Sequence, residues 1–238
     1  MHEEVASSKP SDSWKSTKST VTKTKGKVIS FMCFTPSYAL KELSRQGVRC
    51  VIFTSGTLSP LPALISELGV PISVTLENPH VIEAGQVSVS IVTKGLDGFE
   101  LNSSYKTRND PKYISSLGNA IVNICRIVPH GLLVFFTSYS IMYKCKDDWQ
   151  ESGLWSRICR LKPIFVEPKE KDAFSEVMKE YYAAIQNPET RGACFMTVTR
   201  GKVSEGLDFM DVNGRAVVVT GIPYPPMLEA YVHSKRNI

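Results

Sequence analysis

The sequence lacks the features of a membrane-spanning, secreted or zinc-finger protein. No purely apolar run is longer than five residues, as in Leu132 to Phe136, whereas roughly 20 are needed to span a bilayer. The N-terminus has no apolar segment of the kind that directs secretion. Six cysteines are present, but none form Cys-x-x-Cys and no Cys/His cluster has zinc-finger spacing. We therefore expect reduced structural thiols, no membrane partner, and a chain from the cytosol or nucleus.

Several motifs that carry chemistry are also missing. There is no Gly-x-x-x-x-Gly-Lys-[Ser/Thr] loop, because the Gly201-Lys202 pair is followed by Val203 and has no glycine five residues before it. The chain contains no Gly-x-Gly-x-x-Gly, no Gly-x-Ser-x-Gly and no His-Glu-x-x-His. Motif by motif, these absences argue against a complete P-loop nucleotide site, a dinucleotide site, a serine hydrolase and a zinc protease.

Composition and charge indicate a soluble globular protein with a basic N-terminal tail. Of the 238 residues, 42% are hydrophobic and 21% charged, with a net charge of +5. Residues 1–27 carry six lysines against three acidic residues, so +3 of that charge lies in this segment. The remainder is nearly balanced, and bulk charge alone does not indicate a nucleic-acid partner. We expect residues 1–27, with ten Ser/Thr and few apolar side chains, to be a disordered linker or tail. A basic arm that contacts phosphates is the alternative.

The hydrophobic pattern predicts alternating strands and helices. Apolar runs predict strands at 28–34, 48–54, 87–93, 132–136, 164–166, 193–198 and 216–220. Helical spacing, proline starts and glycine stops predict helices at 36–47, 59–69, 111–128, 138–149 and 173–185. Apolar strands separated by amphipathic helices favour an α/β fold with a parallel sheet covered on both faces.

Chemistry in such sheets lies on loops at the carboxyl ends of strands. The first such loop is Thr54-Ser-Gly-Thr-Leu-Ser-Pro60, whose hydroxyls could hold water or phosphate oxygens or could simply cap the next helix. In the second, Phe135-Phe-Thr-Ser-Tyr139, the hydroxyls could cap a helix or bind a phosphodiester, and Tyr139 could pack in the core or stack on a base. The third, Thr199-Arg-Gly-Lys-Val-Ser-Glu-Gly-Leu-Asp-Phe209, mixes both charge signs with two glycines and favours a functional role.

These three loops, in this order, resemble the third, fourth and fifth motifs of the XPD-like family of superfamily 2 DNA helicases, which carry an iron–sulfur cluster. The segments Leu76-Glu-Asn-Pro-His80, Phe165-Val-Glu-Pro168 and Thr220-Gly-Ile-Pro-Tyr224 support the resemblance. It implies RecA-like motor domains of the P-loop NTPase type that bind ATP between them. Residues 28–76 would then end the first motor domain, and 77–238 would form most of the second.

The resemblance also implies roles for individual residues. Ser55, Gly56 and Thr57 would contact the nucleotide and couple its state to domain movement, and Gly206 and Asp208 would face the nucleotide cleft. Glu205 and Asp208 would act in catalysis. The DNA strand would be bound by Thr137, Ser138, Tyr139, Lys202 and Ser204.

Several parts of the family pattern are absent from this sequence. The phosphate-binding loop, the Asp-Glu-Ala-His box and the four cluster-ligating cysteines are missing, and the chain ends at Ile238 before the sixth motif, Gln-x-x-Gly-Arg-x-x-Arg. ATP and Mg²⁺ would be cofactors of a complete enzyme, whereas the ligands of the family's 4Fe-4S cluster are absent. Arginines of the sixth motif's kind are worth roughly 10³–10⁵ in rate in other nucleotide hydrolases, so we expect the isolated chain to be inactive and its sheet to be truncated at the C-terminus.

We therefore expect a piece of an ATP-dependent DNA helicase of the nucleus that acts in DNA repair and genome maintenance. Its partners would be single-stranded or forked DNA and the missing first motor domain. An alternative is a non-catalytic module that binds nucleic acid or a protein partner. A third possibility is a splice or gene-model fragment that does not fold stably.

Overall fold

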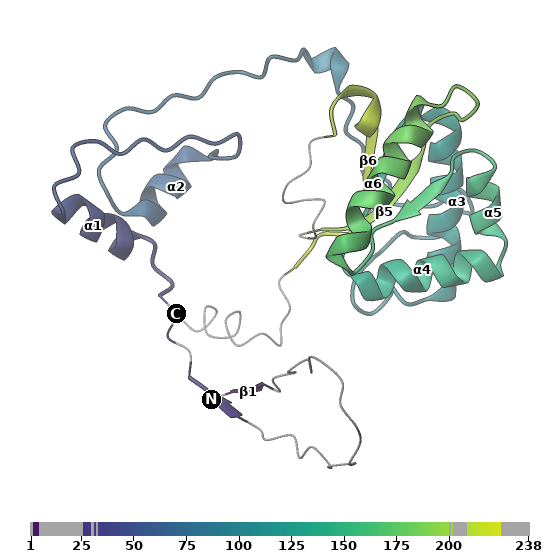
Figure 1. Ribbon diagram of the computed structural model, residues 1–238, viewed down its shortest axis with the longest axis horizontal. Helices are drawn as coiled ribbons and strands as arrows, with labels where there is room; N and C mark the ends of the chain where they lie inside the picture. The colour runs from purple at the N-terminus through teal and green to yellow at the C-terminus, as the bar shows by residue number, and fades with distance from the viewer. Residues whose placement is uncertain are drawn as a thin grey trace, which may run out of the picture. The chain divides into compact units, whose positions relative to one another are not determined.

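The computed structural model describes residues 2–4, 26–29, 31, 33–199, 201 and 209–224. They belong to two compact units, of which one reaches Val87 and the other runs Ser88–Tyr224 (Figure 1). The motor-domain boundary expected after residue 76 stays a prediction, because compactness alone does not show where a motor domain ends.

The second unit is built on a parallel four-stranded sheet. Its strands are β3 (Leu132–Phe136), β4 (Ile164–Val166), β5 (Cys194–Val198) and β6 (Ala216–Val219), in the order β4-β5-β3-β6. Every neighbouring pair is parallel. The α/β fold and all four of these strands are therefore as the sequence predicts.

Helices cover both faces of this sheet, as Figure 1 shows. On one face lie α3 (Pro111–Ile127), α4 (Tyr139–Glu151) and α5 (Leu154–Cys159), and on the other lies α6 (Lys171–Gln186). Successive strand residues point to opposite faces, so Leu132, Val134 and Phe136 join the core under α3, α4 and α5, whereas Leu133 joins the core under α6. The short helix α5 was not predicted from the sequence.

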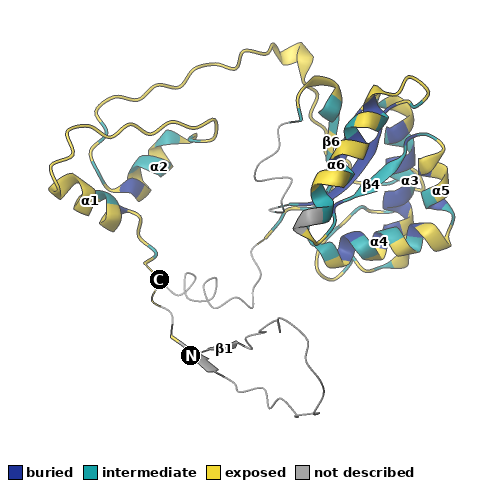
Figure 2. Cartoon of the chain, viewed as in Figure 1, coloured by how far each residue is buried: buried dark blue, intermediate teal, exposed yellow. Residues whose placement is uncertain are grey.

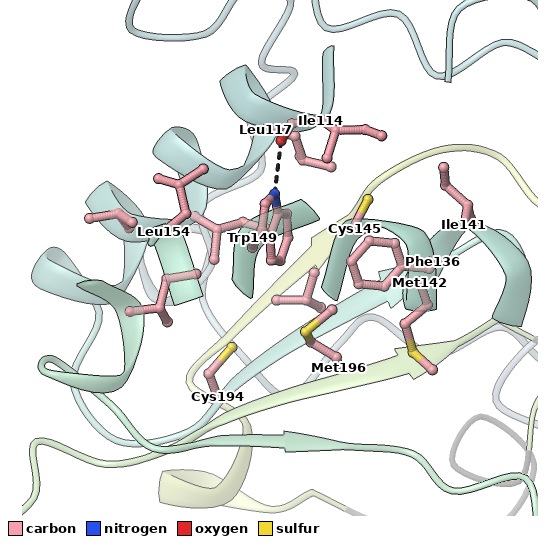
Figure 3. Packing of buried hydrophobic residues seen from close by; sticks show 14 of the residues in the cluster. Ile114, Leu117, Phe136, Ile141, Met142, Cys145, Trp149, Leu154, Cys194 and Met196 are labelled. Carbon is pink, nitrogen blue, oxygen red and sulfur yellow. Dashed lines mark hydrogen bonds between the residues drawn. The ribbon is translucent and has the colours of Figure 1, made fainter. Parts of the chain in front are cut away.

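Local signals explain where the site-bearing helices begin. At the start of α3, the Asp110 carboxylate accepts a hydrogen bond from the Lys112 amide, and Pro111 occupies the first turn. In α4 the hydroxyl of Ser138 accepts from the Ile141 amide. The two helices are joined by Trp149, whose indole N–H donates to the Ile114 carbonyl at 2.9 Å (Figure 3).

The first unit contains two helices and little regular sheet. Helices α1 (Ser37–Arg45) and α2 (Leu61–Leu68) are confirmed, and Gly69 ends α2 with a left-handed φ of 60°. A short 3₁₀ helix, η1, spans Ala84–Gln86. The strands β1 (His2–Glu4) and β2 (Gly26–Val28) pair antiparallel at the two ends of the predicted tail, and residues 5–25 lie outside the described residues.

The strands predicted in this region are wrong. Residues 48–54 and 87–93 form no strand, and among the described residues of 28–34 only Val28 belongs to one. A strand needs a neighbour to receive its hydrogen bonds, and within the described ranges neither 48–54 nor 87–93 pairs with a strand. In these ranges a single backbone bond, from the Leu101 amide to the Thr93 carbonyl, reaches the end of the second segment. The apolar side chains of both segments are consequently exposed, as Figure 2 shows, with Ile52 at 83% and Ile91 at 90%.

Candidate functional site

The carboxyl ends of the parallel strands bring four chain segments to one edge of the sheet. Phe136 at the end of β3 is in register with Val198 at the end of β5, and Phe135 is in register with Val219 of β6. The loops that follow β3 and β5 therefore leave from neighbouring positions. We call this edge, formed by residues 137–139, 167, 197–199, 201 and 220–221, the carboxyl edge.

The loop after β3 presents three of the predicted DNA-binding residues. Thr137, Ser138 and Tyr139 are all half-buried. The Ser138 hydroxyl caps α4, so the capping interpretation of this loop is confirmed for that residue. The helix N-terminus beside it carries backbone N–H groups and a positive dipole end, which suit an anion.

Glu167, the residue after β4, joins this loop to β5. Its side chain is completely buried. One carboxylate oxygen accepts from the Tyr139 hydroxyl at 2.8 Å. The other accepts from the Thr197 hydroxyl at 2.7 Å and from the Val198 amide at 2.9 Å. A buried carboxylate needs such donors, because burying an ion without hydrogen bonds is costly.

Backbone bonds fix the other two segments of the edge. The Thr199 amide and hydroxyl both donate to the Phe136 carbonyl, at 2.9 and 3.1 Å. The Thr220 amide donates to the Phe135 carbonyl at 2.9 Å, and the Thr220 carbonyl accepts from the Tyr113 hydroxyl at 3.4 Å. Gly221 lies against the Ser103 side chain, since a Cβ added there would meet the Ser103 hydroxyl. The residues that follow β5 and β6 are therefore both hydrogen-bonded to the end of β3.

The environment of the tyrosines keeps them neutral. Burial, and then the hydrogen bond to Glu167, raises the pKa of Tyr139 far above its ordinary value. Burial and the Glu167 charge also raise the pKa of Tyr143, whose hydroxyl donates to the Glu167 carbonyl at 3.3 Å. Burial raises the pKa of Tyr113 to about 12. These three phenols, of which Tyr139 belongs to the carboxyl edge, therefore stay protonated and act as hydrogen-bond donors.

The loop predicted to contact nucleotide lies in the first unit. Ser55, Gly56 and Thr57 are exposed and form a compact turn in which the two hydroxyl oxygens are 3.2 Å apart. The Thr57 amide donates to the Ser55 hydroxyl at 3.2 Å. A Cβ added to Gly56 would meet no atom within 4 Å, so its backbone is open to a ligand.

The predicted residues of the third loop lie outside the described residues. They are Lys202, Ser204, Glu205, Gly206 and Asp208. Of this loop the structure describes Thr199, Gly201 and Phe209. The roles assigned to the five residues outside the described ranges stay predictions.

Glu167 and Thr197 were missed as site residues. From the sequence, the Phe165-Val-Glu-Pro168 segment supports only the family resemblance and indicates no role for Glu167. The available signal was the position of an acidic residue directly after the strand 164–166, since carboxyl ends carry function. Thr197 gave no comparable signal, because a single hydroxyl within an apolar strand is ordinary.

The described residues form neither a metal site nor a membrane-spanning helix. Within those ranges, no group of three or more His, Cys, Asp or Glu side chains is placed to hold a metal ion. No helix in the described part of the chain combines the length and apolar character needed to cross a membrane.

Comparison with known proteins defines the class of this fold. Residues 121–238 match the family described as the helicase C-terminal domain. Together with the parallel sheet and its two helical layers, this match makes the second unit an α/β, RecA-like helicase C-terminal domain.

The same comparison finds relatives that match most of the chain. This chain is 52% identical over 232 residues to the regulator of telomere elongation helicase 1 homolog of Anopheles gambiae. It is 54% identical over 231 residues to that of Aedes aegypti, and 55% over 213 to that of Drosophila willistoni. The alignments cover 96%, 96% and 90% of this chain but only 23%, 23% and 21% of those proteins. The chain belongs to the XPD-like helicase family, and it spans less than a quarter of the length of these relatives.

Proposed function

We propose that this chain contributes the second motor domain of an ATP-dependent DNA helicase and binds single-stranded DNA at the carboxyl edge. The observation that carries the proposal is the register of β3 with β5, in which Phe136 faces Val198. This register supports the proposal because the loop after Phe136 and the loop after Val198 leave the sheet from neighbouring positions.

The chemistry of the edge suits a phosphodiester backbone. Hydroxyls and helix N-terminal amides bind phosphate oxygens without reading sequence. Thr137 and Ser138 supply the hydroxyls after β3, and α4 supplies the amides. Lys202 and Ser204 would add a charge and a third hydroxyl.

ATP and Mg²⁺ belong to the same proposal. The exposed turn at Ser55, Gly56 and Thr57 has hydroxyl donors and an open backbone that fit phosphate oxygens. Gly206 and Asp208 would face the nucleotide, and Glu205 with Asp208 would orient the attacking water. Bound ATP would supply the energy for strand movement. The described residues do not fit a 4Fe-4S cluster, because they offer no group of three ligating side chains.

In the complete protein this activity would serve DNA repair and telomere maintenance in the nucleus. The relatives, which are regulator of telomere elongation helicase 1 homologs, support a telomere-associated helicase. The partners would be single-stranded or forked DNA and the first motor domain.

Binding of a fluorescein-labelled single-stranded oligonucleotide to the purified chain tests the proposal. We expect anisotropy to report binding at 50 mM salt that weakens steeply as salt rises, because phosphate contacts release counterions. Adding ATP should change nothing, and DNA should stimulate no phosphate release, since the phosphate-binding lysine loop is absent from this sequence. Absence of binding at low salt would reject the DNA assignment, and rapid ATP turnover would reject the assignment of this chain to a second motor domain that cannot hydrolyse ATP without the phosphate-binding loop.

A further inference from the structure

We propose that Glu167 is a positioning residue that fixes the loop after β3 relative to the start of the loop after β5, at Thr197 to Thr199 and Gly201. The inference rests on the proposed function for its consequence, but its geometry stands on the described residues alone. Glu167 belongs to neither loop, and no residue role predicted from the sequence includes it.

On one side the carboxylate fixes the end of β5. The Thr197 hydroxyl and the Val198 amide donate to the same oxygen, at 2.7 and 2.9 Å. Three residues further, Gly201 passes so close that an added Cβ would lie 2.9 and 3.1 Å from the two carboxylate oxygens. Gly201, in the described start of the loop after β5, therefore lies against the Glu167 carboxylate. A larger residue at position 201 would force the backbone and the carboxylate apart.

On the other side the carboxylate fixes the first residue of α4. The Tyr139 hydroxyl donates to the second oxygen at 2.8 Å. Its ring stacks on Tyr143 with centroids 6.4 Å apart and planes 22° from parallel, and Tyr143 donates to the Glu167 carbonyl. Contacts at both its hydroxyl and its ring therefore fix Tyr139 in place. Thr137 and Ser138, which directly precede it in the chain, are fixed with it.

Glu167 cannot itself contact DNA. Its side chain has no exposed surface, and a carboxylate would repel phosphate. A carboxylate suits the positioning role because it only accepts hydrogen bonds and can receive donors from both loops at once. A glutamine would keep the shape but turn one acceptor into a donor, so that either Tyr139 or the end of β5 would lose its partner.

The test compares Glu167→Gln with Lys162→Met, a matched control. Lys162 is also buried, at the other end of β4, and its ammonium donates to the carbonyls of His130 and Arg191. We would measure deuterium exchange of the peptides that cover 137–143 and 196–201, and the affinity for a labelled single-stranded oligonucleotide. Tyr139→Phe removes a single hydroxyl and repeats the test should Glu167→Gln not fold.

For Glu167→Gln we expect exchange in 137–143 and in 196–201 to accelerate together, and the oligonucleotide Kd to rise about tenfold, the equivalent of one charge-assisted hydrogen bond. For Lys162→Met we expect a lower thermal stability. Deuterium exchange of both peptides and the oligonucleotide Kd should stay as in wild type. Tyr139→Phe should raise the Kd by about threefold, because the carboxylate keeps its bonds to β5.

The outcomes separate this inference from the proposed function. If the wild-type chain does not bind DNA, the proposed function fails, and the exchange of the two peptides still decides whether Glu167 positions them. If the wild-type chain binds DNA but Glu167→Gln leaves exchange and Kd as they were, the positioning role is overturned. Equal loss of affinity in Lys162→Met would also overturn it, because general destabilisation would then be the cause.

Discussion

Lys162 and Glu167 are buried residues of opposite charge that flank the same three-residue strand, β4, with Lys162 two residues before it and Glu167 directly after it. The Lys162 ammonium holds the chain before β3 and β5 through the carbonyls of His130 and Arg191, at 2.7 and 2.5 Å. Glu167 holds the last two residues of β5, Thr197 and Val198. The shortest strand of the sheet is therefore fixed at both ends by charge-assisted hydrogen bonds.

We predict that Lys162→Met lowers the free energy of unfolding by about 1–3 kcal/mol, because two carbonyls each lose a charged donor. Burial lowers the pKa of Lys162 because it disfavours the charged ammonium. Replacing the charge with methionine removes this desolvation cost, which offsets part of the lost stability. Urea denaturation followed by circular dichroism measures the change. Lys144→Met is the control, since the exposed Lys144 donates to a single carbonyl, that of Asn109, and we expect a change within about 0.5 kcal/mol. Equal losses of stability in Lys162→Met and Lys144→Met would contradict a special stabilising role for Lys162.

We predict that Thr197→Val destabilises the chain more than Thr197→Ser. Valine removes a buried donor to the Glu167 carboxylate, at a cost of about 1–3 kcal/mol. Serine keeps the hydroxyl and leaves only a methyl-sized gap, worth roughly 1 kcal/mol. Denaturation curves of the two variants decide the order. A more stable valine variant would show that packing outweighs the hydrogen bond.

We predict that Gly192→Ala is strongly destabilising. Gly192 has φ 106°, and an added Cβ would lie 2.1 Å from the His130 carbonyl oxygen, so the backbone before β5 would have to move. A loss of more than about 2 kcal/mol is expected from strain and displaced packing. Gly85→Ala serves as the control because a Cβ there meets nothing within 4 Å. A Gly192→Ala variant with wild-type thermal stability would be incompatible with this geometry.

We predict that the six cysteines react in two groups in the native state. Cys33, Cys50 and Cys159 are exposed, whereas Cys125, Cys145 and Cys194 are buried. Burial and the neighbouring Asp148 raise the pKa of the Cys145 thiol to about 12, so it is also chemically unreactive at neutral pH. Mass spectrometry after brief iodoacetamide treatment should find labels on the exposed group, and labelling of all six should require denaturant. Rapid labelling of Cys145 would contradict the packing of α4.

We predict a small acid-side loss of stability that depends on Asp97. Its carboxylate accepts from the Ser116 hydroxyl at 2.7 Å and from the Phe99 amide at 3.1 Å, and the first of these bonds chiefly lowers its pKa below the ordinary 3.8. A lowered pKa in the folded state adds stability that is present above pH 3.8 and is lost as the pH falls through the folded-state value. Melting temperatures at pH 6 and pH 3 should therefore differ less in Ser116→Ala than in wild type. Ser115→Ala, at an exposed neighbouring position, should retain the wild-type difference.

The sequence predicted the second unit well because its elements carry strong local signals. Strands 132–136 and 164–166 were placed at the observed bounds, since short apolar runs between helices can only be buried strands. The proline start and apolar stripe of α3 likewise marked its bounds to within one residue. Local signals failed at 48–54 and 87–93, where an apolar run needs partner strands that are not among the described residues.

The candidate site was predicted loop by loop, but its connections were not. Position after a strand was enough to select Thr137, Ser138 and Tyr139. The link from Tyr139 to Thr197 passes through Glu167, which lies 28 residues from one and 30 from the other. Such a contact depends on strand order, and strand order is set by packing and not by any local pattern.

The in-register pairing of β3 with β5 has a mechanical consequence. Five residue pairs, from Leu132 with Cys194 to Phe136 with Val198, connect these strands side by side. A pull on either loop along the strand direction would load all of the connecting hydrogen bonds in shear, so that they resist together and do not unzip one after another. A force applied at the carboxyl edge would therefore be transmitted to the rest of the domain with little deformation of the sheet.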